Sequence, residues 1–395
     1  MLNETNVGLG KVRSSIRELF EYGKKRKAEI GEENVYDFSL GNPSVPAPPE
    51  VKRSLLDIID NTDPVFLHGY TSAQGDFDVR KTIADYINKR FSTSLNADCI
   101  YMTCGAAASL TITLNALVND GDEVITFAPY FPEYKIFSEH AGAKLVAVEC
   151  EDETFQINFD KFASALNKKT KAVIMNSPNN PSGVVYSEEC VKKLCKLLKE
   201  HSQKSGNPVY LISDEPYREL VFDDCIKVPY IMNYYERSIV CYSYSKSLSL
   251  PGERIGYIAV NNEMEEFGDV YAGVCGAGRV LGFVCAPNLF QQLVARVYDK
   301  TSDISIYKNN RDTLCKALRE YGYTVVKPDG AFYLFVKSLE EDSKAFAERA
   351  KKYELLLVAG DDFGCKGYVR ISYCVSPEMI QRSLPAFKLL AESYR

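Results

Sequence analysis

The sequence has few histidines, and its cysteines do not occur in closely spaced pairs. The 395 residues include only three histidines, His68, His140 and His201. Twelve cysteines are scattered along the chain without a Cys-x-x-Cys pair. Structural metal sites usually need such pairs or clustered histidines. We therefore expect no metal site, and we interpret the cysteines as reduced core residues of a cytoplasmic protein.

An excess of positive charge is also missing. The net charge is -6 and the pI is near 5.4, which argues against nucleic acid or an anionic membrane as the main partner. The N-terminus has no basic region followed by an apolar segment, so no secretory signal is expected. The longest nearly uncharged run, residues 270–290, contains Arg279, several glycines and Pro287. Such a run makes a poor membrane helix, and we expect a buried loop and a helix start there.

The chain is long enough for about two or three domains, and 46% of its residues are hydrophobic. Short apolar runs alternate with helical patterns from residue 100 onward, which indicates a largely parallel sheet with helices on both faces. Ligands are expected at the carboxyl ends of such strands. The expected strands are residues 100–103, 124–127, 144–148, 172–175, 209–213 and 238–242.

The pattern changes beyond Pro287. A long helical run with breaks is followed by short strands and a final helix at 377–392, which is typical of a smaller α+β domain. A proline-rich stretch after Gly41 favours a crossover between domains. We expect residues 45–290 to form the large domain, and residues 1–44 and 291–395 to form the small one.

The segment 243–254, Ser-Tyr-Ser-Lys-Ser-Leu-Ser-Leu-Pro-Gly-Glu-Arg, places Lys246 directly after a buried strand. Desolvation disfavours an ammonium ion, so a lysine here is a usable nucleophile for a Schiff base. An ordinary surface lysine in a serine-rich loop would have the same sequence pattern. Ser243, Ser245 and Arg254 add hydroxyl donors and a guanidinium, the groups that complete a phosphate site.

Other candidates follow other strands. Gly105, Ala106 and Ala107 form a strand-to-helix turn whose backbone N–H groups suit a phosphate, or simply a tight helix start. Asp214 ends an apolar strand, where a carboxylate needs a cationic or hydrogen-bonding partner, such as a protonated ring nitrogen, unless it caps a helix.

Tyr217 and Asn180 are candidate donors to a phenolic oxygen on the same ring, although the Asn-Pro and Ser-Gly pairs around Asn180 are also ordinary turn signals. An aromatic residue at Phe131 or Tyr130 would cover the ring face, or only pack in its loop.

Taken in order, these motifs resemble the class I and II aminotransferases, which are fold-type I pyridoxal phosphate (PLP) enzymes. The resemblance runs from Gly41-Asn42-Pro43 to Arg370. It implies an α/β fold with a mostly parallel seven-stranded sheet flanked by helices, plus a smaller α+β domain. It also implies a homodimer that moves an amino group between an L-amino acid and a 2-oxo acid by a ping-pong mechanism.

The resemblance assigns roles to individual residues. Lys246 would hold PLP as a Schiff base and carry the proton, and Asp214 would pair with the ring nitrogen. Tyr217 and Asn180 would bind the ring oxygen, and Phe131 would stack on the ring, with Tyr130 the weaker match. The phosphate would be bound by Gly105, Ala106, Ala107, Ser243, Ser245 and Arg254, and by Tyr70 of the neighbouring subunit. Arg370 would bind the substrate α-carboxylate beside Gly41 and Asn180.

Three questions stay open at this level. Ala107 stands where some aspartate-specific enzymes have a lysine, and Arg279 is a candidate for binding an acidic side chain, so the amino acid is not fixed. A PLP-dependent C–S β-lyase or another elimination enzyme would use the same lysine, aspartate and phosphate site. A cofactor-sensing regulator is disfavoured, because only about forty residues precede Gly41 and they lack a basic recognition helix.

Overall fold

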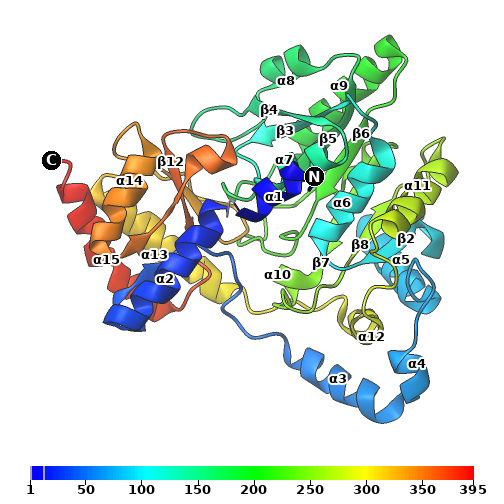
Figure 1. Ribbon diagram of the computed structural model, residues 1–395, viewed down its shortest axis with the longest axis horizontal. Helices are drawn as coiled ribbons and strands as arrows, with labels where there is room; N and C mark the ends of the chain where they lie inside the picture. Colours follow the sequence, from blue (N-terminus) through cyan, green and yellow to red (C-terminus); the bar gives the residue numbers. More distant parts are fainter. Residues whose placement is uncertain (1, 12–13) are drawn as a thin grey trace.

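The computed structural model describes residues 2–11 and 14–395. A seven-stranded sheet with the order β2-β8-β7-β6-β5-β3-β4 forms its centre (Figure 1). Strand β8 is antiparallel to both of its neighbours, and the other neighbouring strands are parallel. The strands are β2 (Ile100–Thr103), β3 (Glu123–Ala128), β4 (Lys144–Glu149), β5 (Thr170–Asn176), β6 (Tyr210–Asp214), β7 (Ser238–Ser243) and β8 (Gly256–Val260). The predicted α/β fold with a mostly parallel seven-stranded sheet is confirmed.

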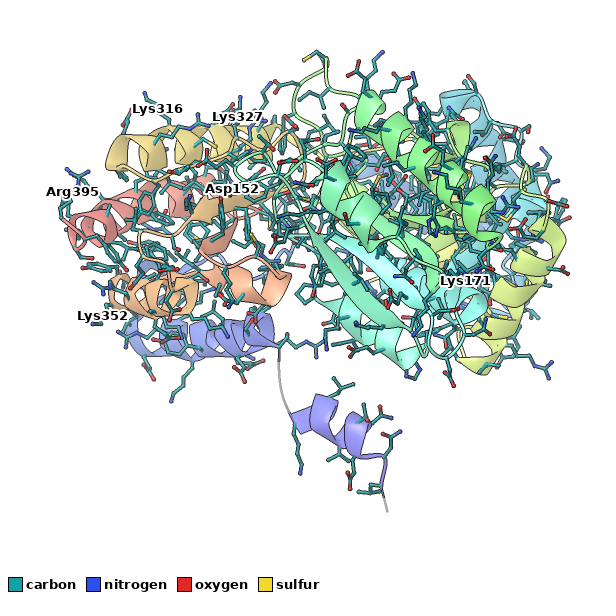
Figure 2. All side chains as sticks on the ribbon, turned by 90° about the horizontal axis from the view of Figure 1, so that it is seen from above. Asp152, Lys171, Lys316, Lys327, Lys352 and Arg395 are labelled. Atoms are coloured by element: carbon teal, nitrogen blue, oxygen red, sulfur yellow. The ribbon has the colours of Figure 1, made fainter. Side chains whose placement is uncertain are left out.

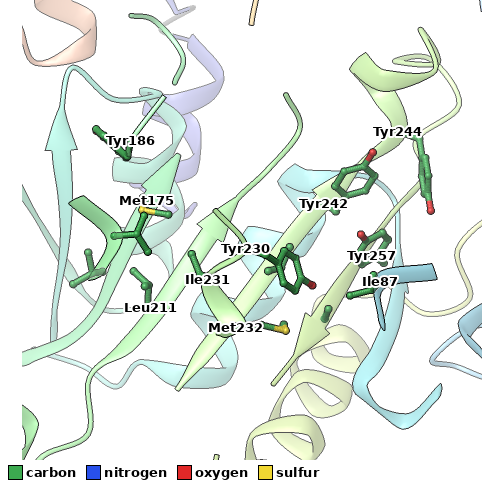
Figure 3. Close-up of a cluster of buried hydrophobic side chains, with 14 of the residues drawn as sticks. Ile87, Met175, Tyr186, Leu211, Tyr230, Ile231, Met232, Tyr242, Tyr244 and Tyr257 are labelled. Atoms are coloured by element: carbon green, nitrogen blue, oxygen red, sulfur yellow. The ribbon is translucent and has the colours of Figure 1, made fainter. Parts of the chain in front are cut away.

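Helices cover both faces of this sheet, as its apolar strands require. One face packs against α6 (Ala106–Leu117), α7 (Glu133–His140) and α11 (Phe267–Val280). The other face packs against α5 (Phe77–Phe91), α8 (Phe159–Ala165), α9 (Glu188–Ser205) and α12 (Asn288–Val297). Figure 3 shows part of the core on this second face. There the rings of Tyr242 in β7 and Tyr257 in β8 stack, with their centres 4.9 Å apart. Apart from β4, these strands are almost completely buried, and this explains their continuous apolar sequences.

A second group of elements has its own core. Strands β11 (Val358–Ala359), β12 (Tyr368–Ser372) and β9 (Tyr333–Lys337) form an antiparallel sheet. Helices α13 (Ser305–Tyr321), α14 (Ser343–Ala350) and α15 (Pro377–Glu392) pack around it, with α2 (Ser15–Ile30) beside them (Figure 1). The short strand β1 (Tyr36–Asp37) pairs in parallel with β10 (Leu355–Leu356), so the N-terminal segment joins this group. The domain boundaries at residues 45 and 290 stay a prediction.

The structure contains elements that the sequence patterns did not indicate. They are α1 (Glu4–Lys11), which lies apart from the rest in Figure 2, α4 (Pro64–His68) and β8. The run 270–290, expected to be a buried loop and a helix start, instead contains most of α11, then a loop and the first residues of α12. At Gly278 the missing side chain allows close packing, because a Cβ there would lie 2.2 Å from the Tyr101 hydroxyl oxygen. Among the described residues, no helix is long and apolar enough to cross a membrane.

The chain directions in the large sheet place the candidate residues at one edge. The parallel strands end there at Thr103, Asn176, Asp214 and Ser243. Because β8 runs the opposite way, it begins at the same edge, where Gly256 pairs with both Thr103 and Ser243. The smaller antiparallel sheet brings Arg370 of β12 to this edge from the other side, so the two groups of elements meet over the site.

Candidate functional site

A cavity of about 270 Å³ lies at this edge of the sheet. It is lined by both groups of elements and by the N-terminal segment that connects them. All of the predicted site residues except Gly105 and Tyr70 contribute to its wall. The lining residues are Ile16, Leu40, Gly41, Ala106, Ala107, Leu110, Phe131, Asn180, Asp214, Pro216, Tyr217, Ser243, Ser245, Lys246, Pro251, Arg254, Tyr333 and Arg370.

Lys246 lies in α10 (Tyr244–Ser247), the single helical turn that follows β7. Its amine donates a hydrogen bond of 2.7 Å to the backbone carbonyl of Gly41, and it lies over the ring of Phe332. Burial lowers the pKa of the amine to about 8, and the positive charges of Arg254 and Arg370 act in the same direction. Roughly a tenth of the amine is therefore neutral, and nucleophilic, at pH 7.

Asp214 is the last residue of β6 and is buried. The Tyr134 hydroxyl donates a hydrogen bond of 2.6 Å to its Oδ2, while its buried Oδ1 has no hydrogen-bond partner. Burial raises the pKa of this carboxyl to about 7, against the opposing effect of the Tyr134 hydrogen bond. An acceptor oxygen left unpaired in an apolar place needs a donor, and a cationic N–H donor suits it best.

Asn176 connects Asp214 to Asn180. Its amide nitrogen donates to the backbone carbonyl of Asp214 at 2.9 Å, and its Oδ1 accepts from the backbone N–H of Asn180 at 2.7 Å. The Asn180 side chain is thereby held at the cavity wall. The hydroxyl of Tyr217 reaches the same cavity and lies 2.8 Å from the hydroxyl of Tyr333.

The predicted phosphate turn and the serine-rich segment meet at one end of the cavity. Helix α6 begins at Ala106, and its N-cap residue Gly105 has a φ of +87°. A Cβ at Gly105 would lie 3.0 Å from a guanidinium nitrogen of Arg254, so glycine permits this close approach.

The hydroxyl oxygens of Ser243 and Ser245 lie 2.7 Å apart beside this turn. Among the described residues, Arg254 forms no ion pair, and its Nη1 donates only to the Pro251 carbonyl. Hydroxyls, a helix N-terminus and a guanidinium without a carboxylate form a suitable set of donors for a phosphate group.

Arg370 is buried at the opposite end of the cavity, and no carboxylate within the described part of the chain pairs with it. Its Nη1 donates to Oδ1 of Asn180 at 3.2 Å, and its Nη2 donates to the Ser39 carbonyl. Its Nε is buried without a partner. Burial lowers the pKa of this guanidinium, which lies between the rings of Tyr333 and Phe363. A buried cation without a counterion indicates a site for an anionic ligand.

Of the two aromatic candidates in the loop after β3, only Phe131 lines the cavity. Phe131 lines the cavity and packs edge-on against Tyr134 at 5.7 Å. Tyr130 is not among the lining residues. Its backbone N–H donates to the Phe363 carbonyl, and a Cβ at Gly364 would touch its ring.

Two further candidates lie away from the cavity of their own chain. The side chain of Tyr70 is 99% exposed, and Arg279 is exposed near the end of α11. The loop that follows α11 is attached to the Tyr70 loop, because the Cys285 backbone N–H donates to the Ala73 carbonyl at 3.3 Å. The two loops that follow these residues are therefore neighbours. In the described residues, no group of three or more His, Cys, Asp or Glu is placed to hold a metal ion.

Two side chains at this site were not among the residues expected from the sequence. Tyr134 is the partner of Asp214, and Tyr333 contacts Tyr217, Arg370 and Gly41. Tyr134 belongs to the first turn of α7 and Tyr333 to an apolar strand, where tyrosine is an ordinary core residue. No local signal marked them, because their roles depend on residues far away in the sequence.

The chain matches known proteins over most of its length. The pattern of the family described as aminotransferase class I and II matches residues 33–387. The aspartate aminotransferase of Thermotoga maritima is 29% identical over 93% of this chain and 95% of its own. The (5-formylfuran-3-yl)methyl phosphate transaminase of Methanocaldococcus jannaschii is 31% identical over 81% of this chain and 82% of its own.

Solved structures agree with these sequence matches. An aminotransferase from Eubacterium rectale has 56% identity and a TM-score of 0.98, covering all of this chain and 99% of its own. The structure of the Thermotoga maritima aspartate aminotransferase has 28% identity and a TM-score of 0.85, covering 96% and 98% of the two chains. The protein therefore belongs to the class I and II aminotransferases, with the fold-type I architecture, and is an aminotransferase.

Proposed function

We propose that this aminotransferase works with PLP bound in the cavity between the two groups of elements. The unpartnered Oδ1 of Asp214 carries this proposal most directly, because it is a buried acceptor in the same cavity as a nucleophilic lysine. A protonated ring nitrogen would satisfy it. Lys246 would bind the aldehyde carbon, and Tyr217 and Asn180 the ring oxygen, with Phe131 against the ring.

The donor set at the other end of the cavity fits the phosphate. Ser243, Ser245, Arg254 and the backbone of residues 105–107 would bind it. PLP would supply an electron-withdrawing ring that stabilises negative charge at the substrate α-carbon. The chain itself would provide the binding, the orientation and the proton transfer.

Arg370 and Asn180 would bind the α-carboxylate of the amino acid, with Gly41 beside it. The guanidinium geometry matches a carboxylate in two-point contact, which lysine does not reproduce. Lys246 Nζ would remove the proton from the substrate α-carbon and deliver it to the cofactor carbon. A second 2-oxo acid would then reverse these steps, which gives ping-pong kinetics.

Among the described residues, the cavity wall contains no cation left over to bind the side chain of an acidic amino acid. The cations in its lining are Lys246, Arg254 and Arg370, and each already has a role in the proposal. The walls that remain include the apolar side chains of Ile16 and Leu40. A second substrate carboxylate would need a further cation, for which Arg279 of another subunit is a candidate.

The proposal includes a cytoplasmic homodimer without a metal ion. Tyr70 does not line the cavity described above and is almost fully exposed, so its contact with a phosphate would be made in the cavity of another subunit. Exposed apolar side chains of α4 and α5, Val65, Phe66 and Phe77, support an interface in the same region. We extend the proposal to the domain division, with residues 45–290 carrying the cofactor and residues 1–44 and 291–395 closing over it.

Two measurements test this function. Borohydride reduction of the holoenzyme should leave a pyridoxyl group on Lys246, as shown by peptide mass spectrometry. A label on another lysine would refute the site assignment. Purified protein with 2-oxoglutarate or pyruvate as acceptor and a panel of amino acids should form glutamate or alanine. Pyruvate and ammonia formed from a sulfur amino acid without any transamination would instead support the lyase.

A further inference from the structure

Tyr333 contacts three parts of the site at once. It begins strand β9, is 2% exposed and lines the cavity. Its hydroxyl lies 2.8 Å from the hydroxyl of Tyr217, and the Arg370 guanidinium lies 4.8 Å from the centre of its ring. A Cβ at Gly41 would lie 2.0 Å from the Tyr333 hydroxyl oxygen, so this backbone is also in direct contact.

The two tyrosine hydroxyls contain two hydrogens between them. Their mutual hydrogen bond is the one that each makes among the described residues, and it uses one hydrogen. The other hydrogen is free to point into the cavity. The tyrosine that donates within the pair uses its hydrogen, so the free hydrogen belongs to the tyrosine that accepts.

The charges around the pair favour Tyr333 as the donor. Burial raises the pKa of both hydroxyls, and Arg370 opposes this effect in both. The Arg370 guanidinium lies over the ring of Tyr333, whereas no cation among the described residues lies over the ring of Tyr217, so Tyr333 is the more acidic of the two. The more acidic hydroxyl is the stronger donor, and the less acidic one is the better acceptor. A hydroxyl that accepts a hydrogen bond also becomes a stronger donor through its own hydrogen.

We propose that Tyr333 is a positioning residue for Tyr217: its hydroxyl donates to the Tyr217 oxygen and so directs the Tyr217 hydrogen to the ring oxygen of the cofactor. This inference rests on the proposed function, because it needs PLP on Lys246. Through its ring contact with Arg370, Tyr333 links the carboxylate end of the cavity to the ring oxygen.

The visible absorbance of the holoenzyme provides a direct readout. A donor to the ring oxygen stabilises negative charge there, and this matters most when the lysine nitrogen has lost its proton. A strong donor therefore lowers the pH at which the absorbance changes. The Tyr333→Phe variant keeps the ring on Arg370 and loses only the hydroxyl, so its absorbance pKa should rise by about 0.3 to 1 pH unit.

A double-mutant cycle separates positioning from a general structural effect. Tyr217→Phe should raise the absorbance pKa more than Tyr333→Phe does, and adding Tyr333→Phe to it should change nothing further. Equal shifts with and without the Tyr217 hydroxyl would overturn the proposal. Tyr373→Phe is the matched control, because Tyr373 is fully buried and donates to the Ala331 backbone without lining the cavity. Its absorbance pKa should equal that of the wild type.

A second variant perturbs the same hydroxyl from the other side. Gly41→Ala would push its methyl group against the Tyr333 hydroxyl oxygen, so it should also raise the absorbance pKa. The Gly41→Ala, Tyr333→Phe double variant lacks the closest of these contacts, although the ring carbon Cζ still lies 2.8 Å from the added methyl group. With the hydroxyl gone, its absorbance pKa should be no higher than in Tyr333→Phe. If borohydride labels Lys246 but neither variant shifts the pKa, the positioning role is wrong while the proposed function stands. Without that label, both are wrong.

Discussion

Tyr134 donates its hydroxyl hydrogen to Oδ2 of Asp214, and the other carboxylate oxygen faces the cavity without a partner. One half of the carboxylate is thus fixed by the protein, and the other half is available to a ligand. Strand β6 and helix α7 set this arrangement together, because neither element alone contains both residues.

Asp214 should reduce the stability of the cofactor-free protein as the pH rises. The carboxyl of the unfolded chain has the ordinary pKa of 3.8, whereas burial raises the pKa of the folded one to about 7. Stability is therefore lost between these two values and stays low above the higher one. Asp214→Asn has no such loss. The difference in melting temperature, variant minus wild type, should therefore become larger as the pH is raised from about 5 to about 8. A difference that does not change with pH would contradict the pKa shift.

Capture of PLP by the cofactor-free protein should depend on the neutral Lys246 amine. The capture rate should increase with pH through a midpoint near the lowered pKa of about 8. Arg370→Met removes one of the positive neighbours that lower this pKa, and its midpoint should move to higher pH. Stopped-flow absorbance measures both midpoints, and an unchanged midpoint in the variant would argue against the electrostatic contribution.

Arg254 should distinguish PLP from pyridoxal, which lacks the phosphate. In Arg254→Met the affinity for PLP should fall by about ten- to a hundredfold, the effect of losing charge-assisted hydrogen bonds. Affinity for pyridoxal should hardly change. Arg53→Met, at an exposed arginine paired with Glu50, is the control and should bind both as the wild type does. Equal losses for the two ligands would remove Arg254 from the phosphate site.

Arg370→Lys should keep the charge but lose the two-point contact with a carboxylate. We expect kcat/KM for amino acids to decrease by about ten- to a hundredfold. The absorbance spectrum of bound PLP should be retained, because Arg370 lies at the other end of the cavity from the phosphate donors. Steady-state kinetics and the spectrum measure the two effects. Loss of the cofactor in this variant would show that Arg370 acts on the fold instead.

Mixing two inactive variants tests whether Tyr70 acts in the other subunit. Lys246→Ala lacks the nucleophile, and Tyr70→Ala lacks the exposed hydroxyl. A hybrid dimer has one site with both defects and one site with neither, if Tyr70 reaches across the interface. Activity should therefore appear when the two proteins are unfolded, mixed and refolded together. A mixture no more active than the two separate variants would place Tyr70 outside the neighbouring site.

The sequence predicted most of the fold because the strands of the central sheet are continuous apolar runs. It also indicated Lys246 and Asp214 as candidates, since polar residues at the ends of buried strands are costly without a role. Strand β8 was missed because it directly follows the loop of Arg254, without a helix before it. Tyr134 and Tyr333 were missed because a tyrosine in an apolar pattern looks the same whether or not its hydroxyl faces a cavity.

The antiparallel direction of β8 decides where Arg254 lies. This residue comes two positions before Gly256, at the start of the strand, and so shares an edge with Gly105 and Ser243. In an all-parallel sheet, the start of a strand lies at the opposite edge. For a strand of five residues that displacement is about 16 Å, far beyond the reach of a guanidinium across the cavity. Reversing one strand therefore allows a short loop, rather than a helical crossover, to deliver the cation.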